Sequence, residues 1–244
     1  MKIIVIFKWL RNPQDARVGT DGLVDWCGAK MSPNDDDPAA ITVAKDLAAD
    51  SGEIVGLTIA DGDVSWAAAR GADSTVVVTD AHTEADSAAT GAILAAAVHR
   101  IGNPDLVLIG DSSWDYGVVS ALVGQLGWPA LANVVSAKTE GGRLQVTQKG
   151  GAVTRVVEVG GSVVLAVAAS RAEQQVPGMK QVLAARKKPV TKLTVADLGI
   201  SPAGKAIFGG TRLPDKPMAK MFDGGDPATA AAQIVAALRM DGVL

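Results

Sequence analysis

The first half of the chain alternates short apolar strands with alanine-rich helical segments, and this alternation constrains the fold more than any other feature. A β-branched run at 3–7 predicts a buried strand, and the apolar positions of 37–49 recur at helical spacing. Successive strand–helix units predict a parallel, right-handed, doubly wound sheet. The predicted strands are 3–7, 56–59, 74–78 and 106–109, and the predicted helices are 37–49, 64–70, 86–101 and 118–126.

Beyond residue 129 the pattern changes to strand-like pieces separated by Gly-Gly turns. The pieces at 134–137, 144–148, 153–159 and 163–169 predict meander strands added to the parallel sheet. From residue 189 the chain is rich in Pro and Lys, which predicts an extended arm over 189–226, and a last helix is expected over 227–240 with Asp226 as its N-cap. The predicted fold is α/β, a doubly wound and mostly parallel sheet with added antiparallel strands. We expect this domain over 1–188 and an arm with a helix over 189–244.

Composition excludes several classes of protein. With 23 Lys and Arg against 26 Asp and Glu, the net charge is −3, which argues against nucleic-acid binding by bulk charge. The single cysteine, Cys27, excludes a disulfide framework and a cysteine-rich zinc site. No apolar run is long enough to span a bilayer, and the first ten residues lack the features of a signal peptide. We therefore expect a cytoplasmic protein without membrane insertion.

The loop at 110–117 follows a predicted strand and precedes a predicted helix. Ligands of doubly wound sheets bind beyond the carboxyl ends of the strands, and a helix N-terminus favours a phosphate group. The loop supplies the small residues Gly110, Ser112, Ser113 and Gly117 and the carboxylates Asp111 and Asp115, which suit ribose hydroxyls. A nucleotide site and a solvated Ser/Asp turn are both open, and Trp114 either stacks on a bound ring or packs against the core.

Three adjacent carboxylates, at 35–37, precede the first predicted helix. They suggest either a divalent cation site or caps of the helix that follows, where their charge favours the helix N-terminus. The cap is the preferred interpretation, because no calcium-loop spacing is present. His82 and His99 have no partner at a credible ligand or triad spacing. The chain also has no G-x-G-x-x-G, P-loop or G-x-S-x-G motif, so we expect no catalytic residues and no metal.

The stretch 174–189 combines an apolar tip with a basic cluster. Val176 is followed by a helical segment that ends in Arg186-Lys187-Lys188-Pro189. One interpretation is a surface loop with basic residues at a helix C-terminus. The other is a docking loop with an exposed apolar anchor.

In their order and spacing, several segments resemble the beta subunit of electron transfer flavoprotein. The run at 179–189 and the start of the loop at 110–113 are most similar to the branch tied to anaerobic carnitine metabolism and nitrogen fixation. The matching segments are 3–8, Ala69-Arg70-Gly71-Ala72-Asp73, 104–110, Gly127-Trp128-Pro129, 177–189 and Ala196-Asp197-Leu198-Gly199.

The resemblance implies one half of an alpha/beta heterodimer that carries electrons and has no bond-making residues of its own. The alpha subunit would hold most of a redox FAD, and the beta subunit would bind an adenine nucleotide, either AMP or a second FAD, on a Rossmann-like fold. The implied partners are acyl-CoA dehydrogenases on one side and a quinone oxidoreductase, ferredoxin or flavodoxin on the other. A flavin does the redox chemistry in such proteins, and the subunit supplies binding and orientation.

Transferred residue by residue, the resemblance also assigns binding roles. The implied nucleotide contacts are Ile6, Asn34, Asp37, Ile59, Gly110, Asp111, Ser112, Ser113, Asp115, Gly117 and Val118. The implied docking residues, which would contact the dehydrogenase, are Val176, Pro177, Gly178, Met179 and Lys180.

Two departures from the family pattern leave the ligand open. Asp35-Asp36 stand where the family has Pro-Phe, and Val118-Val119 stand where it has Gln and Thr. AMP, FAD and an empty site therefore remain alternatives. A different class, an AMP- or ATP-binding regulatory module on a related α/β fold, is the alternative function.

Overall fold

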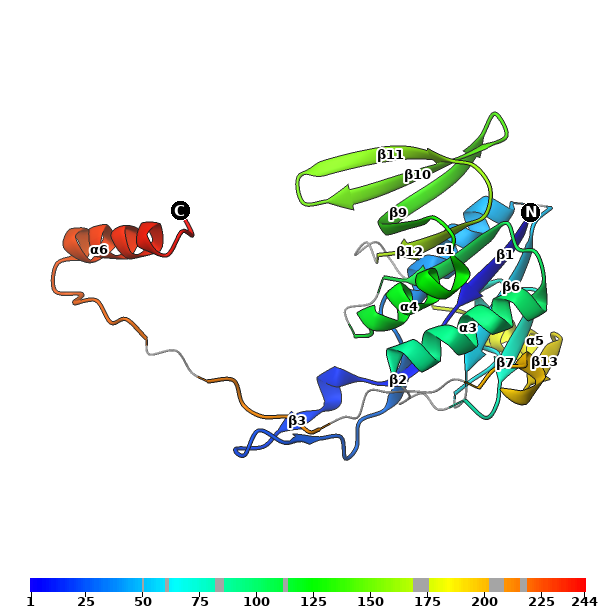
Figure 1. Ribbon diagram of the computed structural model, residues 1–244, viewed down its shortest axis with the longest axis horizontal. Coiled ribbons are helices and arrows are strands. Elements are labelled where there is room, and N and C mark those ends of the chain that lie inside the picture. The colour runs from blue at the N-terminus through cyan, green and yellow to red at the C-terminus, as the bar shows by residue number, and fades with distance from the viewer. Residues whose placement is uncertain are drawn as a thin grey trace. The chain divides into compact units, whose positions relative to one another are not determined.

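A mixed sheet with nine strands forms the centre of the described structure (Figure 1). The computed structural model describes residues 1–49, 51–59, 62–81, 86–111, 114–168, 176–201, 209–215 and 219–244. The strands lie in the order β11-β10-β9-β12-β8-β1-β6-β7-β13. They are β1 (Lys2–Ile6), β6 (Glu53–Ile59), β7 (Ser74–Val78), β8 (Leu106–Gly110), β9 (Ala130–Glu140), β10 (Arg143–Gly150), β11 (Val153–Val159), β12 (Val163–Val167) and β13 (Val190–Leu193).

The helices follow the strands much as the sequence predicts. They are α1 (Asp37–Ala48), α2 (Trp66–Arg70), α3 (Ser87–Ile101), α4 (Tyr116–Leu126), α5 (Met179–Ala185) and α6 (Pro227–Met240), with short 3-10 helices η1 (Pro13–Asp15) and η2 (Ala196–Leu198). Two two-stranded sheets lie between β1 and α1 in the sequence, a region for which the sequence predicts no strand. They pair β2 (Trp9–Arg11) with β5 (Met31–Pro33) and β3 (Arg17–Val18) with β4 (Val24–Asp25).

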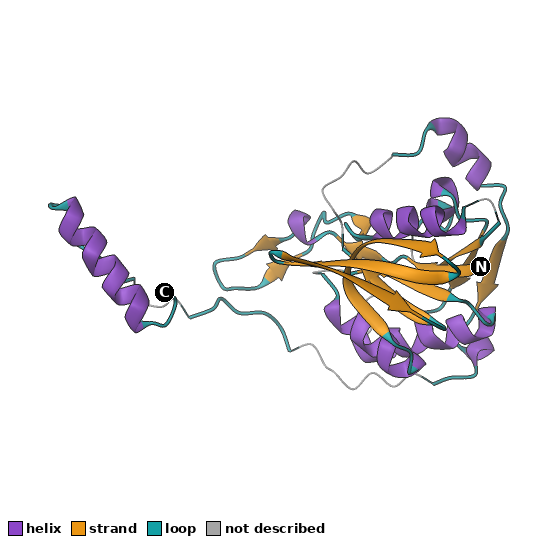
Figure 2. Cartoon of the chain, turned by 90° about the horizontal axis from the view of Figure 1, so that it is seen from above, coloured by secondary structure: helices purple, strands orange, loops and turns teal. Residues whose placement is uncertain are grey.

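Helices cover both faces of the sheet, which gives the structure two hydrophobic cores (Figure 2). Alternate residues of a strand point to opposite faces. In β1, Ile3 and Val5 therefore belong to the core under α1 and α2, whereas Ile4 and Ile6 belong to the core under α3 and α4. Burial on both faces explains why β1 and β8 read as continuous apolar runs in the sequence. The predicted doubly wound fold is confirmed.

The second half of the sheet departs from the predicted order. Strands β9, β10 and β11 form an antiparallel meander, as expected. The strand that follows them was expected to continue this meander, and that prediction is wrong. β12 is parallel to both β8 and β9 and lies between them in the sheet. Its five residues are all buried, which marks a central strand rather than part of an exposed hairpin.

The segment after residue 189 also departs from the prediction. β13 pairs in parallel with β7, from Val190 opposite Thr75 to Leu193 opposite Val78. Leu198, in η2, packs against the core under α3. The prediction of an extended arm from residue 189 is therefore wrong for β13 and η2. Pro189 and the exposed side chains of β13 are typical of an edge strand, which explains why its apolar signal is weak.

The described chain divides into two compact units. One comprises Met1–Arg17 and Val24–Gly209, and the other comprises Val18–Leu23 and Gly210–Leu244. Within the second unit, the backbone of Arg212 passes close to Gly22, where φ is +81°. Helix α6 also belongs to this unit. Its N-cap is Asp226, whose carboxylate accepts the amide hydrogens of Ala228 and Thr229 as predicted. No described helix is both long and apolar enough to cross a membrane.

Helices α3 and α4 approach closely at small residues. A Cβ atom at Gly91 would lie 2.5 Å from the Cβ of Ala121 and 2.8 Å from its carbonyl carbon. Since that neighbour includes backbone, an added methyl group requires the helices to separate. Gly124, also in α4, has no atom within 4 Å of the corresponding position.

We expect Gly91→Ala to lower the free energy of unfolding by about 1–3 kcal/mol, because it overpacks the α3–α4 contact. The matched control, Gly124→Ala, is expected to raise it by about 0.5–1 kcal/mol, because alanine favours a helix and meets no neighbour. Chemical denaturation of the full chain measures both values. Equal effects of the two substitutions would contradict the packing described for α3 and α4.

Candidate functional site

The strand order places a crevice between the carboxyl ends of β1 and β8. From β1 the chain moves through α1 to β6 and through α2 to β7 on one side. It then returns through α3 to β8 on the other side of β1. The strand order therefore reverses between β1 and β8. Open α/β sheets bind their ligands at this kind of topological switch point.

A hollow that opens to solvent lies at this crevice. Apolar side chains form most of its walls, and polar groups from three different segments reach into it. This combination of apolar walls and a few convergent polar groups is typical of small-molecule sites. The lining residues are Ile6, Lys8, Leu10, Asn34, Asp37, Leu94, Ile109, Gly110, Asp115, Val118 and Val119.

The carboxyl group of Asp37 ties together the segments around the hollow. It lies at the start of α1, is almost fully buried, and accepts the amide hydrogens of Lys8 at 3.2 Å and Asn34 at 3.1 Å. Burial raises the pKa of Asp37 to about 8, although the two amide hydrogen bonds act in the opposite direction. These bonds join the end of β1 to the segment that leads into α1.

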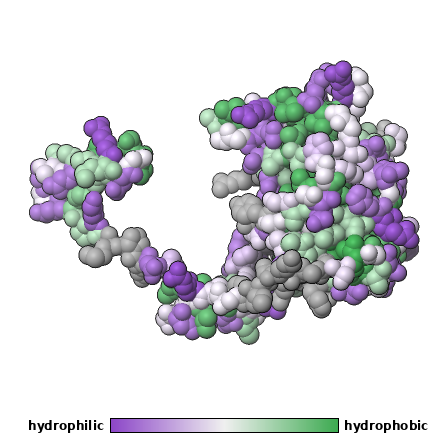
Figure 3. Space-filling model, in the orientation of Figure 1, coloured by the Kyte–Doolittle hydropathy of each residue, from purple (hydrophilic) through white to green (hydrophobic). Residues whose placement is uncertain are grey.

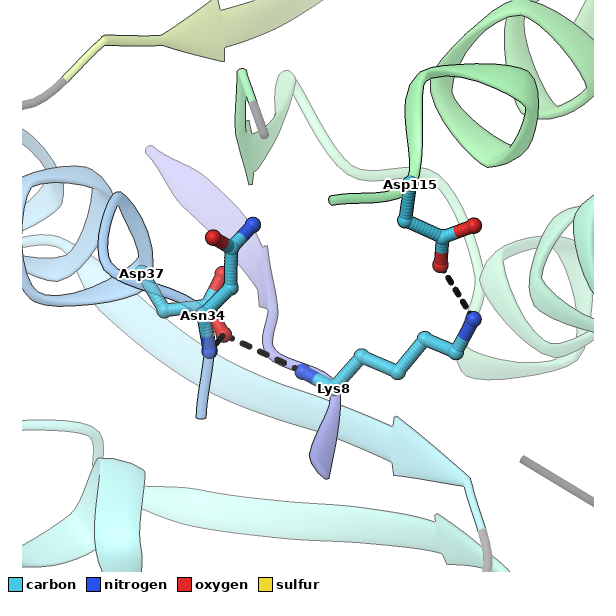
Figure 4. A network of polar contacts seen from close by, with 4 residues as sticks. All are labelled: Lys8, Asn34, Asp37 and Asp115. Atoms are coloured by element: carbon cyan, nitrogen blue, oxygen red, sulfur yellow. Dashed lines mark hydrogen bonds and ion pairs between the residues drawn. The ribbon is translucent and has the colours of Figure 1, made fainter. Parts of the chain in front are cut away.

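Lys8 and Asp115 form an ion pair at the hollow, as Figure 4 shows. The Lys8 side chain extends from the end of β1 to the loop that precedes α4, and both side chains are largely buried. Lys8 is the functional candidate that the sequence analysis missed. Its signal was available, because it is a lysine placed directly after a buried parallel strand, at the edge of the sheet where ligands bind.

Gly110 allows the end of β8 to approach the start of α1. A Cβ atom at this position would lie 2.8 Å from Asp37 Oδ1 and 3.1 Å from the Asp37 nitrogen. Only glycine leaves room for this approach without moving the buried carboxyl group. The role of Gly110 in the structure is therefore to bring β8 and α1 together at the rim of the hollow.

The structure brings together six of the residues predicted to contact a nucleotide and leaves others elsewhere. Ile6, Asn34, Asp37, Gly110, Asp115 and Val118 all line the hollow. Three others do not line it. Ile59 is buried at the end of β6, the Asp111 carboxylate accepts the amide hydrogen of Asn133 at 2.7 Å, and Gly117 lies against Ser87. Ser112 and Ser113 lie outside the described residues.

The carboxylates of Asp36 and Asp37 do not cap α1 as predicted. Asp36 occupies the N-cap position without a side-chain hydrogen bond to the first turn, and the Asp37 carboxylate accepts amide hydrogens from outside the helix. The predicted cap of α1 is therefore wrong. The expected acidic residue at the helix N-terminus is present, because Asp37 lies in the first turn. In the described part of the chain, no three His, Cys, Asp or Glu side chains are close enough to hold a metal ion.

The predicted docking residues lie at a second cavity. Val176 and Pro177 line it, together with side chains of α1 and α2. Val176 is 85% exposed, and Met179 and Lys180 of α5 are exposed as well. Gly178 is also exposed, and its amide hydrogen bonds to Gln181 Oε1. The structure therefore presents this segment to solvent, as a docking loop requires.

A family model described as electron transfer flavoprotein domain matches residues 27–198 of the chain. The chain belongs to the electron transfer flavoprotein family. A beta subunit from Mycobacterium leprae is 30% identical over 186 residues, which cover 71% of this chain and 70% of the relative. A beta subunit from Syntrophomonas wolfei is 30% identical over 166 residues, which cover 63% of this chain and 64% of the relative. Similarity to the carnitine and nitrogen-fixation branch stays a prediction.

The family's name implies a flavin, and the hollow combines apolar walls with hydrogen-bond donors. Ile6, Ile109 and Val118 offer apolar walls for a base. The ammonium group of Lys8 and the amide of Asn34 offer donors to anionic or carbonyl oxygens. The hollow therefore resembles a ligand site of an open α/β sheet in two respects, its position at the switch point and the kinds of residue that line it.

The raised pKa of Asp37 predicts a pH dependence of stability. A carboxyl group titrates near pH 4 in the unfolded chain and near pH 8 in the folded one, so the folded state retains the proton between these values. The contribution of this group is therefore full below about pH 4 and is lost as pH rises toward 8, by at most about 1.4 kcal/mol per pH unit.

We expect Asp37→Asn to remove this dependence, because an amide keeps an acceptor oxygen and does not titrate. The variant should be less sensitive than the wild type to a rise from pH 5 to pH 8 in denaturation experiments. Asp46→Asn, at an exposed carboxylate of the same helix, is the control and should follow the wild type. Identical pH profiles for wild type and Asp37→Asn would exclude a titrating Asp37.

Proposed function

We propose that the chain is the beta subunit of an alpha/beta electron transfer flavoprotein and holds an adenine nucleotide between β1 and β8. The observation that carries this proposal is the hollow at the switch point, within a chain that belongs to this family. The subunit is a carrier rather than an enzyme. A flavin supplies the redox chemistry when bound, and the chain supplies binding and orientation.

In this proposal different residues of the hollow contact the base, the phosphate and the ribose of the nucleotide. The apolar walls of Ile6, Ile109 and Val118 contact the adenine base. Lys8 neutralises the phosphate, and Asp115, released from its ion pair with Lys8, accepts hydrogen bonds from ribose hydroxyls. Either AMP or the AMP half of a second FAD meets these requirements. The proposal leaves the choice to measurement, because both ligands present the same adenosine monophosphate group.

The second part of the proposal concerns the electron donor and acceptor. Val176, Pro177, Gly178, Met179 and Lys180 dock an acyl-CoA dehydrogenase, and the electrons leave to a quinone oxidoreductase, ferredoxin or flavodoxin. The exposure of Val176 supports the docking role, because an apolar side chain so fully in water gains free energy when a partner covers it.

Val176→Asp should lower the rate at which an acyl-CoA dehydrogenase reduces the alpha/beta complex by about tenfold or more, because it places an unpaired charge in the docking contact. Stopped-flow flavin absorbance measures the rate, and the bound flavin should be unchanged. Val176→Leu keeps an apolar anchor and should retain most of the rate. Equal rates for wild type and Val176→Asp would disprove the docking role.

The third part of the proposal assigns the C-terminal segment to the alpha subunit. No residue of α6 is buried, and its apolar side chains Ile234 and Val235 are 43% and 39% exposed. Apolar side chains are visible on the surface of this helix in Figure 3. An amphipathic helix is stabilised mainly by covering its apolar face. We propose that the alpha subunit provides that cover.

Deletion of residues 210–244 should abolish the alpha/beta complex while the first unit stays folded. The cut at Gly209 keeps β13 and η2, whereas a cut before Lys192 would divide the edge strand β13. Size-exclusion chromatography of the co-expressed chains measures the pairing, and circular dichroism checks the fold. Full-affinity pairing by the truncated chain would contradict the assignment. A full-length chain that self-associates without the alpha subunit would favour the regulatory-module alternative.

A further inference from the structure

The second cavity lies between α1, α2 and the segment that precedes α5, and it opens to solvent. Its described lining contains two cationic side chains, Lys45 and Arg70, and no carboxylate. The remaining lining residues are neutral: Pro38, Ile41, Thr42, Ala69, Val176, Pro177 and Gln181. The charge of this lining therefore favours an anionic group.

The guanidinium group of Arg70 is held in place before any ligand arrives. It lies 4.1 Å from the centroid of the Trp66 ring, and one of its terminal nitrogens donates to the Trp66 carbonyl oxygen at 3.2 Å. Its Nε atom is buried and has no hydrogen-bond partner among the described residues. The terminal guanidinium nitrogens are therefore the donors that a bound acceptor would use.

Lys45 faces the same cavity from α1. Its aliphatic stem lies where a side chain on Gly71 would be, since a Cβ atom there would be 2.8 Å from Lys45 Cδ. None of the ion pairs between described residues involves Lys45 or Arg70. Asp63, whose charge acts on Arg70, lies outside the lining and accepts hydrogen bonds from Ser65.

Another cation near the docking segment, Lys188, does not line the cavity and makes hydrogen bonds to backbone carbonyls. Lys188, in the basic cluster after α5, donates to the carbonyl oxygens of Ala72 at 2.6 Å and Ala68 at 3.3 Å. Its ammonium group therefore satisfies carbonyls at the C-terminal end of α2 and fastens α5 against that helix. Lys45 and Arg70 are the cations that line the cavity itself.

We propose that this cavity binds the carboxylate of an acidic side chain of the dehydrogenase that docks on the 176–180 segment. Val176 lines the cavity and is exposed, so an apolar contact with Val176 and an ionic contact with Lys45 and Arg70 belong to one continuous surface. An arginine held by an aromatic ring is well suited to a carboxylate. The inference rests on the proposed function, because it needs a protein docked on this segment.

Kinetics at low ionic strength test the proposal. Lys45→Glu should raise the KM of an acyl-CoA dehydrogenase for the alpha/beta complex by about tenfold and leave kcat unchanged, because a repelled carboxylate weakens encounter. The KM of the wild type should rise with added salt, and that of Lys45→Glu should not. Lys138→Glu makes the same charge change on β9, outside the cavity, and should alter KM less than about twofold.

A carbodiimide, which joins amines to nearby carboxylates, identifies the contact directly. Mass spectrometry should find Lys45 joined to an Asp or Glu of the dehydrogenase. Lys45→Arg should lose this cross-link and retain the wild-type KM. If wild type and Lys45→Glu have the same KM and no cross-link forms at Lys45, the proposal is overturned while dehydrogenase docking on Val176 stands.

A peptide probe separates failure of this inference from failure of the proposed function. If no acyl-CoA dehydrogenase reduces the wild-type complex, the proposed function fails and the dehydrogenase is not the occupant. Binding of hexaglutamate to the complex then tests the cavity alone. Affinity at least about fivefold lower in Lys45→Glu than in Lys138→Glu would support a carboxylate site. Equal affinities in the two variants would overturn it.

Discussion

The buried carboxyl group of Asp37 is the contact on which the candidate site depends. Through the amides of Lys8 and Asn34, it joins the segment that follows β1, the segment before α1 and the first turn of α1. Gly110 then allows β8 to approach this group. Because a buried carboxyl group is costly unless it is hydrogen-bonded, the position of these segments and the protonation of Asp37 are linked. A charged group bound in the hollow would therefore change the protonation of Asp37 and, with it, the contacts that hold these segments.

Helix α1 connects the two sites on the first unit. Its first residue, Asp37, lines the hollow at the switch point, and Pro38, Ile41 and Lys45 line the cavity beside the docking segment. Its inward face, including Ala40 and Ala44, is buried against the sheet. The same rigid element therefore supports the proposed nucleotide site and the proposed docking surface.

Sequence periodicity predicted the bounds of helices and strands better than it predicted which strands pair in the sheet. β7, β11 and α6 have the predicted bounds, because their apolar patterns end at Gly, Pro or Asp residues. The position of β12 depends on long-range pairing, which its apolar run does not reveal. The weak edge strand β13 was missed for a related reason, since it gains its order from β7. The position of Lys8 after the first predicted strand was an available signal, but its ion pair with Asp115, which is distant in the sequence, could not be read from that position.

The most direct test of this account is the quantity of nucleotide released from the co-expressed alpha/beta complex, measured by mass spectrometry per heterodimer. The account predicts an adenine nucleotide in addition to the FAD shared with the alpha subunit, either AMP or a second FAD. In Lys8→Met this additional nucleotide should fall by about fivefold or more, because its phosphate loses a charge-assisted hydrogen bond, while Lys138→Met should retain it. Release of a single FAD and nothing else from the wild type, or full occupancy in Lys8→Met, would contradict a nucleotide site between β1 and β8.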